Sequence, residues 1–335
     1  MPHFCCGPQP AVPDGVRQPG GQGGHPMIKY ILKRILYLIP VMLLVTLIVF
    51  ALMSITKGDP ARIIVGESAS IEEVEAMRES MGLNAPFLIR YLRYIRDLFL
   101  HGDLGTSYKS GLPVMKEITS ALPSTIRLSL AAIVIAILVG IPIGVISATR
   151  QYSFFDNFTM ILGLIGISMP VFWLGLLLIL FFSVKLGWFP PSGLTSFRHV
   201  ILPAFTLGTQ SIAVFARMTR SSMLEVIRQD YIRTVRAKGQ TEARITMDHV
   251  LRNALVPIVT VVGIQFGNLL GGAVLCETIF SINGVGRLMV DAIKQRDFPV
   301  VQGGVLFISL VFCLINLIID IIYAFLDPKI KSQYK

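Results

Sequence analysis

Charged residues are scarce in this sequence, and their scarcity excludes an ordinary soluble domain. They make up 15% of the 335 residues, whereas hydrophobic residues make up 53%. Soluble domains carry about 25% charged residues. The formal net charge of +10 comes from short basic segments beside apolar runs, where basic residues set membrane topology. The composition therefore predicts a protein of the lipid bilayer and does not favour a nucleic-acid partner.

Cysteine and histidine are also few, which argues against a disulfide framework, a metal centre and a catalytic site built on them. The cysteines are Cys5, Cys6, Cys276 and Cys313, and the histidines beyond the N-terminal segment are His101, His199 and His249. The cysteines have no metal-ligand spacing, and the histidines are far apart. We expect no metal site and no catalytic residues. Acylation of the two N-terminal cysteines is an alternative use for that pair.

A nucleotide-binding loop is missing as well. Glycine nowhere precedes lysine, so the Gly-Lys-Ser/Thr end of a phosphate-binding loop is absent, and with it the lysine that holds ATP phosphates. We expect this chain to bind no cofactor of its own and to hydrolyse no ATP.

Long apolar runs, in contrast, are abundant and predict an all-α polytopic membrane protein with six transmembrane helices. Four runs contain no ionisable residue and are long enough to cross about 30 Å of hydrocarbon. Two weaker runs hold Pro203 or Asp320. Both are still interpreted as spans, because omitting either would put the basic segment 217–252 and the basic C-terminus on opposite sides of the membrane. The six predicted spans are Ile35–Ile55, Leu128–Thr149, Phe158–Val184, Val200–Ala216, Asn253–Cys276 and Val300–Leu326.

Basic residues flank both the first and the last span, which predicts that both termini are cytoplasmic. Residues 1–26 are rich in Pro and Gly without apolar periodicity, so we expect a disordered extension before a natural start at Met27. The first transmembrane helix then occupies residues 27–56, an external subdomain 57–122, and a five-helix core 123–335.

The external segment should contain two helices. Ser70 and Glu73 form a capping box, and Gly82 ends the first helix. Pro86 opens the second, whose apolar residues are Leu88, Leu92, Ile95 and Phe99. We expect a compact helical subdomain that either braces the bundle or seats an extracytoplasmic partner.

The segment 217–252 is the longest charged interruption of the core. It carries eight basic and four acidic residues, which predicts a cytoplasmic position. Leu224, Ile227, Tyr231 and Val235 lie at helical spacing. Gly239 can close that helix in a left-handed conformation, and Thr241 can cap the next one. We therefore predict a helix, an elbow and a second helix at the membrane surface.

Small and polar residues inside the spans predict helix contacts. Gly263, Gly267 and Gly271 recur on one face of the fifth span and would let another backbone approach closely. Pro142, between Gly140 and Gly144, and Pro170 mark candidate kinks. The polar residues expected to lie between helices or along the pathway are Gln265, Asn268, Asn316 and Asp320.

Several long motifs, in order, resemble the permease subunit of bacterial ABC importers for dipeptides, oligopeptides, glutathione and nickel. They are Gly58-Asp59-Pro60, Met81-Gly82-Leu83, Gly102 to Gly105 with Ser107, Ser168 to Gly175, Arg217 to Val226, Asp230 to Gly239, and Gly284 to Gly303. The resemblance covers the chain from Met27 to its end.

The resemblance implies a division of labour between subunits. A second homologous permease, two ABC ATPase subunits that bind ATP and Mg²⁺, and an extracytoplasmic substrate-binding protein would complete the importer in the inner membrane. The charged loop would contain the coupling helix that docks on an ATPase. The residues expected to dock or couple are Tyr231, Arg233, Thr234, Arg236, Ala237, Lys238, Gly239 and Glu242.

The match to the broad importer family is not complete. Arg233, Thr234 and Val235 stand where that family has Glu, Ala and Ala, a departure that resembles the peptide and nickel branch. A loop that only anchors topology, an ATP-independent secondary transporter or channel, and a membrane-embedded enzyme remain as alternatives. The secondary transporter is not favoured because no internal repeat is found. The substrate stays open among peptides, glutathione, nickel complexes and related solutes.

Overall fold

The computed structural model describes residues 26–55, 58–66 and 68–326, and the extension over residues 1–25 lies outside them. The described part of the chain is all-α, with a single isolated bridge between Thr106 and Pro113. The elements are α1 Pro26–Ile55, α2 Pro60–Val65, α3 Ile71–Ser80, α4 Phe87–His101, α5 Val114–Thr149, α6 Phe154–Ser168, α7 Val171–Leu178, the π-helical η1 Ile179–Lys185, α8 Phe197–Ile227, α9 Asp230–Ala237, α10 Glu242–Arg244, the π-helical η2 Ile245–Leu251, α11 Arg252–Ile279, α12 Val285–Gln295 and α13 Phe298–Leu326.

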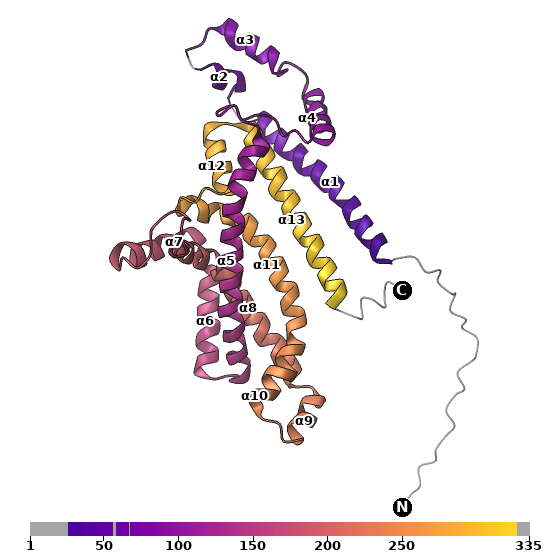
Figure 1. The fold of residues 1–335 in the computed structure, drawn as a ribbon, viewed down its shortest axis with the longest axis vertical. Coiled ribbons are helices and arrows are strands. Elements are labelled where there is room, and N and C mark those ends of the chain that lie inside the picture. The colour runs from indigo at the N-terminus through magenta and orange to yellow at the C-terminus, as the bar shows by residue number, and fades with distance from the viewer. Residues whose placement is uncertain (1–25, 56–57, 67, 327–335) are drawn as a thin grey trace, which may run out of the picture.

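Five stretches of helix are long and apolar enough to cross a membrane, and a sixth is present if the bent pair of α6 with α7 and η1 counts as one span. The five are Leu36–Ile55, Val114–Thr149, Phe197–Ile227, Glu242–Ile279 and Phe298–Ile319. Figure 1 shows α2, α3 and α4 together with α12 at one end of the bundle, and α9 and α10 at the other. The predicted polytopic helical architecture is therefore confirmed.

The third predicted span, Phe158–Val184, is not one straight helix. The chain bends by 106° between α6 and α7, at the motif that follows Ser168. Pro170 restricts Met169 to an extended conformation, with φ −79° and ψ 126°, because the proline ring clashes with a helical residue before it. The helix ends there, and Pro170 then stands at the N-cap of α7.

The α5 and α8 helices form the most extensive helix contact in the bundle, and glycines let them approach. A Cβ at Gly140 would lie 2.7 Å from the backbone oxygen of Ile212, and a Cβ at Gly144 would lie 2.6 Å from that of Ala216. The α5 helix continues as one element through Pro142. Gly140 and Gly144 therefore serve the close packing of helices, a role that the sequence predicts for Gly263, Gly267 and Gly271 of α11.

The segment between α1 and α5 contains the predicted helices as α3 and α4, and part of its apolar surface is exposed. The capping box of Ser70 and Glu73 is present on α3. On α4, however, the residues Leu88, Leu92 and Phe99 are exposed. The face that α4 buries carries Tyr91, whose hydroxyl donates to the backbone oxygen of Leu43 in α1 at 3.0 Å. The α4 helix is thus attached to the first span through its tyrosine face.

A buried carboxylate fixes α12 at the same end of the bundle. Glu277 in α11 is fully buried and accepts the hydroxyl of Thr125 at 2.6 Å and the backbone N–H of Arg287 at 3.0 Å. The backbone N–H of Val285 donates to Thr125 Oγ1 at 2.9 Å. A Cβ at Gly284 would overlap the Glu277 carboxylate. The carboxylate thus satisfies free amides at the N-terminus of α12.

We expect Glu277→Gln to lower the stability of the chain by about 1 to 3 kcal/mol, because one acceptor oxygen becomes an NH₂ group that faces a donor. The thermal unfolding midpoint of the purified chain measures this effect. Glu225→Gln on the exposed side of α8 is the control and should leave the midpoint unchanged. Equal midpoints for both variants would show that the carboxylate does not hold α12.

Candidate coupling and transport site

The helix, elbow and second helix predicted for the charged loop are present, but the first helix is divided. The α8 helix continues to Ile227, eleven residues beyond the predicted end of its span at Ala216, and α9 begins at Asp230. Leu224 and Ile227 therefore lie on α8, whereas Tyr231 and Val235 lie on α9, so the single helical face expected for these four residues is wrong. The break at Arg228 and Gln229 turns α9 away from α8.

An apolar cluster attaches α9 to the bundle, chiefly through Ile232 and in part through Val235. Ile232 is fully buried among Met223 of α8, Ile245 and Val250 of η2, and Ala254 of α11. At the end of the same helix, Gly239 has φ +79° and its N–H donates to the backbone oxygen of Arg236 at 3.0 Å. Thr241 stands at the N-cap of α10, but its side chain forms no capping hydrogen bond.

The opposite face of α9 and the elbow is exposed. Arg233 pairs with Asp230 at 3.6 Å, with both side chains largely in solvent. The hydroxyl of Tyr231 accepts from Asn253 Nδ2 at 2.8 Å, which ties α9 to α11. All eight residues expected to dock an ATPase lie on this exposed surface: Tyr231, Arg233, Thr234, Arg236, Ala237, Lys238, Gly239 and Glu242.

An ion pair closes the elbow across Gly239. Arg236 Nε donates to Glu242 Oε1 at 2.6 Å, and Arg236 Nη2 donates to Oε2 at 3.1 Å. The hydrogen bond to this carboxylate raises the pKa of the Arg236 guanidinium above its ordinary value. Because the pair joins the end of α9 to the start of α10, it holds the two arms of the elbow in one orientation.

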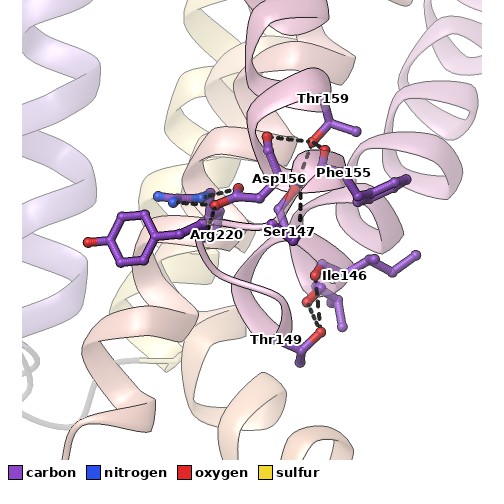
Figure 2. Close-up of polar contacts among 10 residues, drawn as sticks. Ile146, Ser147, Thr149, Phe155, Asp156, Thr159 and Arg220 are labelled. Atoms are coloured by element: carbon purple, nitrogen blue, oxygen red, sulfur yellow. Dashed lines mark hydrogen bonds and ion pairs between the residues drawn. The ribbon is translucent and has the colours of Figure 1, made fainter.

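A second, buried ion pair supports the helix that leads into the elbow. Asp156 at the start of α6 is 1% exposed and receives Arg220 Nε at 2.7 Å and Nη2 at 2.8 Å. The N–H of Tyr152 also donates to Asp156 at 2.9 Å. Figure 2 shows this pair beside the contact of Ser147 with Thr159, which joins α5 to α6 at 2.8 Å.

Sequence reasoning missed this pair, since it treated Arg220 as one of many topological charges. The available signal was an acidic residue, Asp156, in the first turn of a helix without other charges, three residues after the capping Ser153. The pair connects the α5–α6 turn to the C-terminal part of α8. It therefore belongs to the framework that positions α9.

Two glycines of the α11 stripe, Gly263 and Gly267, pack against α13. A Cβ at Gly263 would lie 2.6 Å from the side chain of Ile319, and one at Gly267 would lie 3.2 Å from the ring of Phe312. The nearest atoms at both positions belong to side chains of α13, and the close approach of a backbone to this stripe stays a prediction. Gly271 has no described atom within 4 Å of its Cβ position and forms no such contact within the described chain.

The polar residues of the spans separate into two groups. Gln265 Nε2 of α11 donates to the buried Ser211 of α8 at 3.4 Å, so Gln265 lies between helices. Asn268 is exposed, and its Nδ2 donates to Gln265 Oε1 within α11 at 3.0 Å. Asn316 donates to the backbone oxygen of Phe312 within its own helix. The prediction for Asp320 concerns a side chain outside those that the structure describes.

Comparisons with known proteins cover most of the chain. Residues 140–332 match the family described as binding-protein-dependent transport system inner membrane component, and residues 27–131 match the N-terminal part of such membrane components. The dipeptide transport system permease protein DppB of Alkalihalophilus pseudofirmus is 44% identical over 333 residues, which are 91% of this chain and 100% of that protein. The glutathione transport system permease protein GsiC of Salmonella paratyphi A is 45% identical over 307 residues, with 92% and 100% covered.

A solved structure agrees with the fold. The inward-facing MetNI methionine ABC transporter contains a chain that superposes with a TM-score of 0.55 at 20% identity, over 64% of this chain and 97% of that one. At this identity the likeness shows the fold alone. The family matches extend over more than half of the sequence, and the two curated relatives are matched over their whole length. The chain therefore belongs to the inner-membrane permease components of binding-protein-dependent ABC transport systems.

Proposed function

We propose that this permease imports a small peptide, such as a dipeptide or glutathione, that an extracytoplasmic binding protein delivers. The support for this substrate class is the likeness to a dipeptide permease and a glutathione permease that are 44% and 45% identical to this chain. A second homologous permease would complete the pathway. Two ATPase subunits would bind ATP and Mg²⁺ and supply the energy, and both termini of this chain would be cytoplasmic.

The observation that supports this proposal most directly is the two-sided character of α9. Ile232 fixes one face in the bundle, while the other face exposes charged and polar residues around the Gly239 elbow. An exposed helix held by an apolar anchor can receive force from a soluble subunit and transmit it to α8 and α11. Docking of the ATPase on this surface is the proposed coupling step.

We expect Gly239→Val to abolish substrate uptake while membrane insertion stays normal. A β-branched residue at positive φ costs about 1 to 3 kcal/mol locally, so the elbow should shift and displace α10 relative to α9. Gly239→Asn is the matched control, because asparagine tolerates the left-handed conformation. Uptake, ATPase co-purification and membrane content should be measured for both variants.

Charge reversal tests the same surface without straining the backbone. Arg233 is exposed, so Arg233→Glu should leave folding unchanged and weaken both ATPase association and uptake. Arg244→Glu, on the far side of the elbow, is its control. Full uptake with undiminished ATPase association in Gly239→Val and Arg233→Glu would remove the elbow from the coupling role and leave it as a topological anchor.

The substrate proposal has its own measurement. Mass spectrometry of the ligand retained by the cognate binding protein should identify a short peptide or glutathione. A nickel complex or a non-peptide solute in its place would overturn the substrate class without affecting the coupling proposal.

A further inference from the structure

Several motifs that carry no role in coupling converge on one cavity at the external end of the bundle. The cavity has a volume of about 310 Å³ and is lined by the motif Gly58 to Pro60, by Leu83, by Tyr108 and by Phe298 with Gln302. These residues come from four separate parts of the sequence. Their convergence indicates that the motifs build a common site rather than four unrelated turns.

Guanidinium groups dominate the charge of this cavity. Arg78 of α3 and Arg90 of α4 line it, and Asp59 is the carboxylate among its lining residues. A third guanidinium lies at its edge, because a Cβ at Gly58 would be 2.8 Å from Arg296 Nη1. Two guanidinium groups and one carboxylate therefore line the cavity, and a third guanidinium lies beside it.

The arginines are only weakly engaged by the protein. Arg78 Nη1 lies 3.4 Å from Asp59 Oδ2, and Arg78 Nε is buried without a hydrogen-bond partner among the described residues. Arg90 lies over the ring of Phe50, with 5.7 Å between its Cζ and the ring centroid. A buried donor without a partner costs about 1 to 3 kcal/mol, and an acceptor in the cavity would satisfy it.

The second nearby carboxylate is already satisfied. Asp297 accepts the hydroxyl of Ser107 at 2.5 Å and the backbone N–H groups of Tyr108 and Lys109 at 3.1 and 3.3 Å. Burial raises the pKa of Tyr108 to about 12, so its hydroxyl stays neutral and adds no negative charge. Neutral donors leave the negative charge of Asp297 in place, so the three arginines outnumber the two carboxylates, Asp59 and Asp297, and a net positive charge is left for a ligand.

We propose that this cavity binds an oxyanion, with Arg78 and Arg90 as the groups that hold it. The planar fork of a guanidinium matches the oxygens of a phosphate or a carboxylate and forms strong charge-assisted hydrogen bonds with them. The cavity lies at the end of α1, beside Phe50 and Met53, where the first span leaves the membrane. This position gives access both to a phospholipid headgroup and to an anion dissolved outside the membrane.

The test uses the full chain purified in dodecyl maltoside, a detergent without phosphate. Inorganic phosphate and a soluble short-chain phosphatidylglycerol are titrated separately, with sodium chloride at matched ionic strength as the salt control. The apparent affinity is measured from the shift of the thermal unfolding midpoint. Stabilisation by both probes identifies a site open to soluble anions, and stabilisation by the lipid alone identifies a headgroup site.

Four variants test whether the shift of the unfolding midpoint arises from binding in the cavity. Arg78→Gln and Arg90→Gln should each bind the active probe about tenfold more weakly, the effect of losing one charge-assisted hydrogen bond. Arg96→Gln is the matched control, because Arg96 lies on the exposed part of α4 and pairs with Asp97. Asp59→Asn keeps a capping side chain for α2 and removes the opposing charge, so it should bind more tightly.

The Asp59 variant separates binding from folding. A purely structural role of these arginines predicts that Asp59→Asn weakens the site, whereas anion binding predicts the opposite. No stabilisation of the parent by either probe, or equal responses of the parent and Arg90→Gln, would overturn the proposal. Neither result would affect the coupling role of α9, since residues of α2, α3 and α4 line the cavity and these helices lie at the end of the bundle opposite to α9 (Figure 1).

Discussion

Asp156→Ala is expected to destabilise the chain by about 1 to 3 kcal/mol, because it leaves the partly buried guanidinium of Arg220, whose side chain is 24% exposed, without its partner carboxylate. Asp156 is 1% exposed and binds Arg220 through two hydrogen bonds of 2.7 and 2.8 Å. The same change removes the acceptor for Tyr152 N–H. The unfolding midpoint and substrate uptake of the assembled transporter should both fall, since Arg220 lies on the helix that leads into α9.

Two further variants test whether the pair itself is responsible. Asp156→Leu combined with Arg220→Met removes both charges and should recover much of the lost stability, because hydrophobic replacement of a buried pair is often neutral. Asp97→Ala breaks an exposed pair and should change stability by less than about 1 kcal/mol. If the double variant were no more stable than Asp156→Ala, the loss would come from the turn at Tyr152 rather than from an unpaired charge.

Local backbone rules explain the parts of the fold that the sequence predicted well. The capping box needs only Ser70 and Glu73, three residues apart. The left-handed conformation of Gly239 depends on the absence of a Cβ and on the helix that precedes it. Such features are decided within a few residues, so one sequence is enough to recognise them.

Contacts between distant residues could not be predicted in this way. Asp156 and Arg220 are separated by 64 positions, and Thr125 and Glu277 by 152. The sequence shows that each charge lies in or beside an apolar span and must find a partner. It does not show which partner, because the helix arrangement decides that choice. The elbow could be predicted because its residues are neighbours in the sequence. The ion pair of Asp156 with Arg220, which supports it, could not be predicted.

The bend between α6 and α7 depends both on a local backbone rule and on contacts with distant residues. Pro170 was recognised as a weak point, and its effect on Met169 ends α6. The direction and size of the bend depend on packing, since Gly175 of α7 lies against Thr206 of α8 and Phe280 after α11. A proline therefore predicts the position of a break, and the surrounding helices determine whether it becomes a kink or a turn of 106°.

Gly144→Leu is expected to prevent packing of the helix bundle, because the leucine side chain would push apart α5 and α8, which form the most extensive helix contact. The Cβ alone would lie 2.5 Å from Thr219 Cβ and 2.6 Å from the backbone oxygen of Ala216. Backbone cannot move aside as a flexible side chain can, so even Gly144→Ala should cost about 1 to 3 kcal/mol, the range of overpacked interiors. The amount of chain in the membrane and its unfolding midpoint measure the two effects.

Gly163→Ala is the matched control for the alanine variant. Gly163 also lies in an apolar helix, but its Cβ would be 3.6 Å from Ala213 Cβ, an ordinary contact. Both substitutions change helix propensity alike, so a difference between them reports the distance between helices. Because α8 continues into the elbow, a separation of α5 from α8 at Gly144 should also displace α9 and reduce uptake. Equal stability and uptake for Gly144→Ala and Gly163→Ala would mean that α5 and α8 are not held together at this glycine.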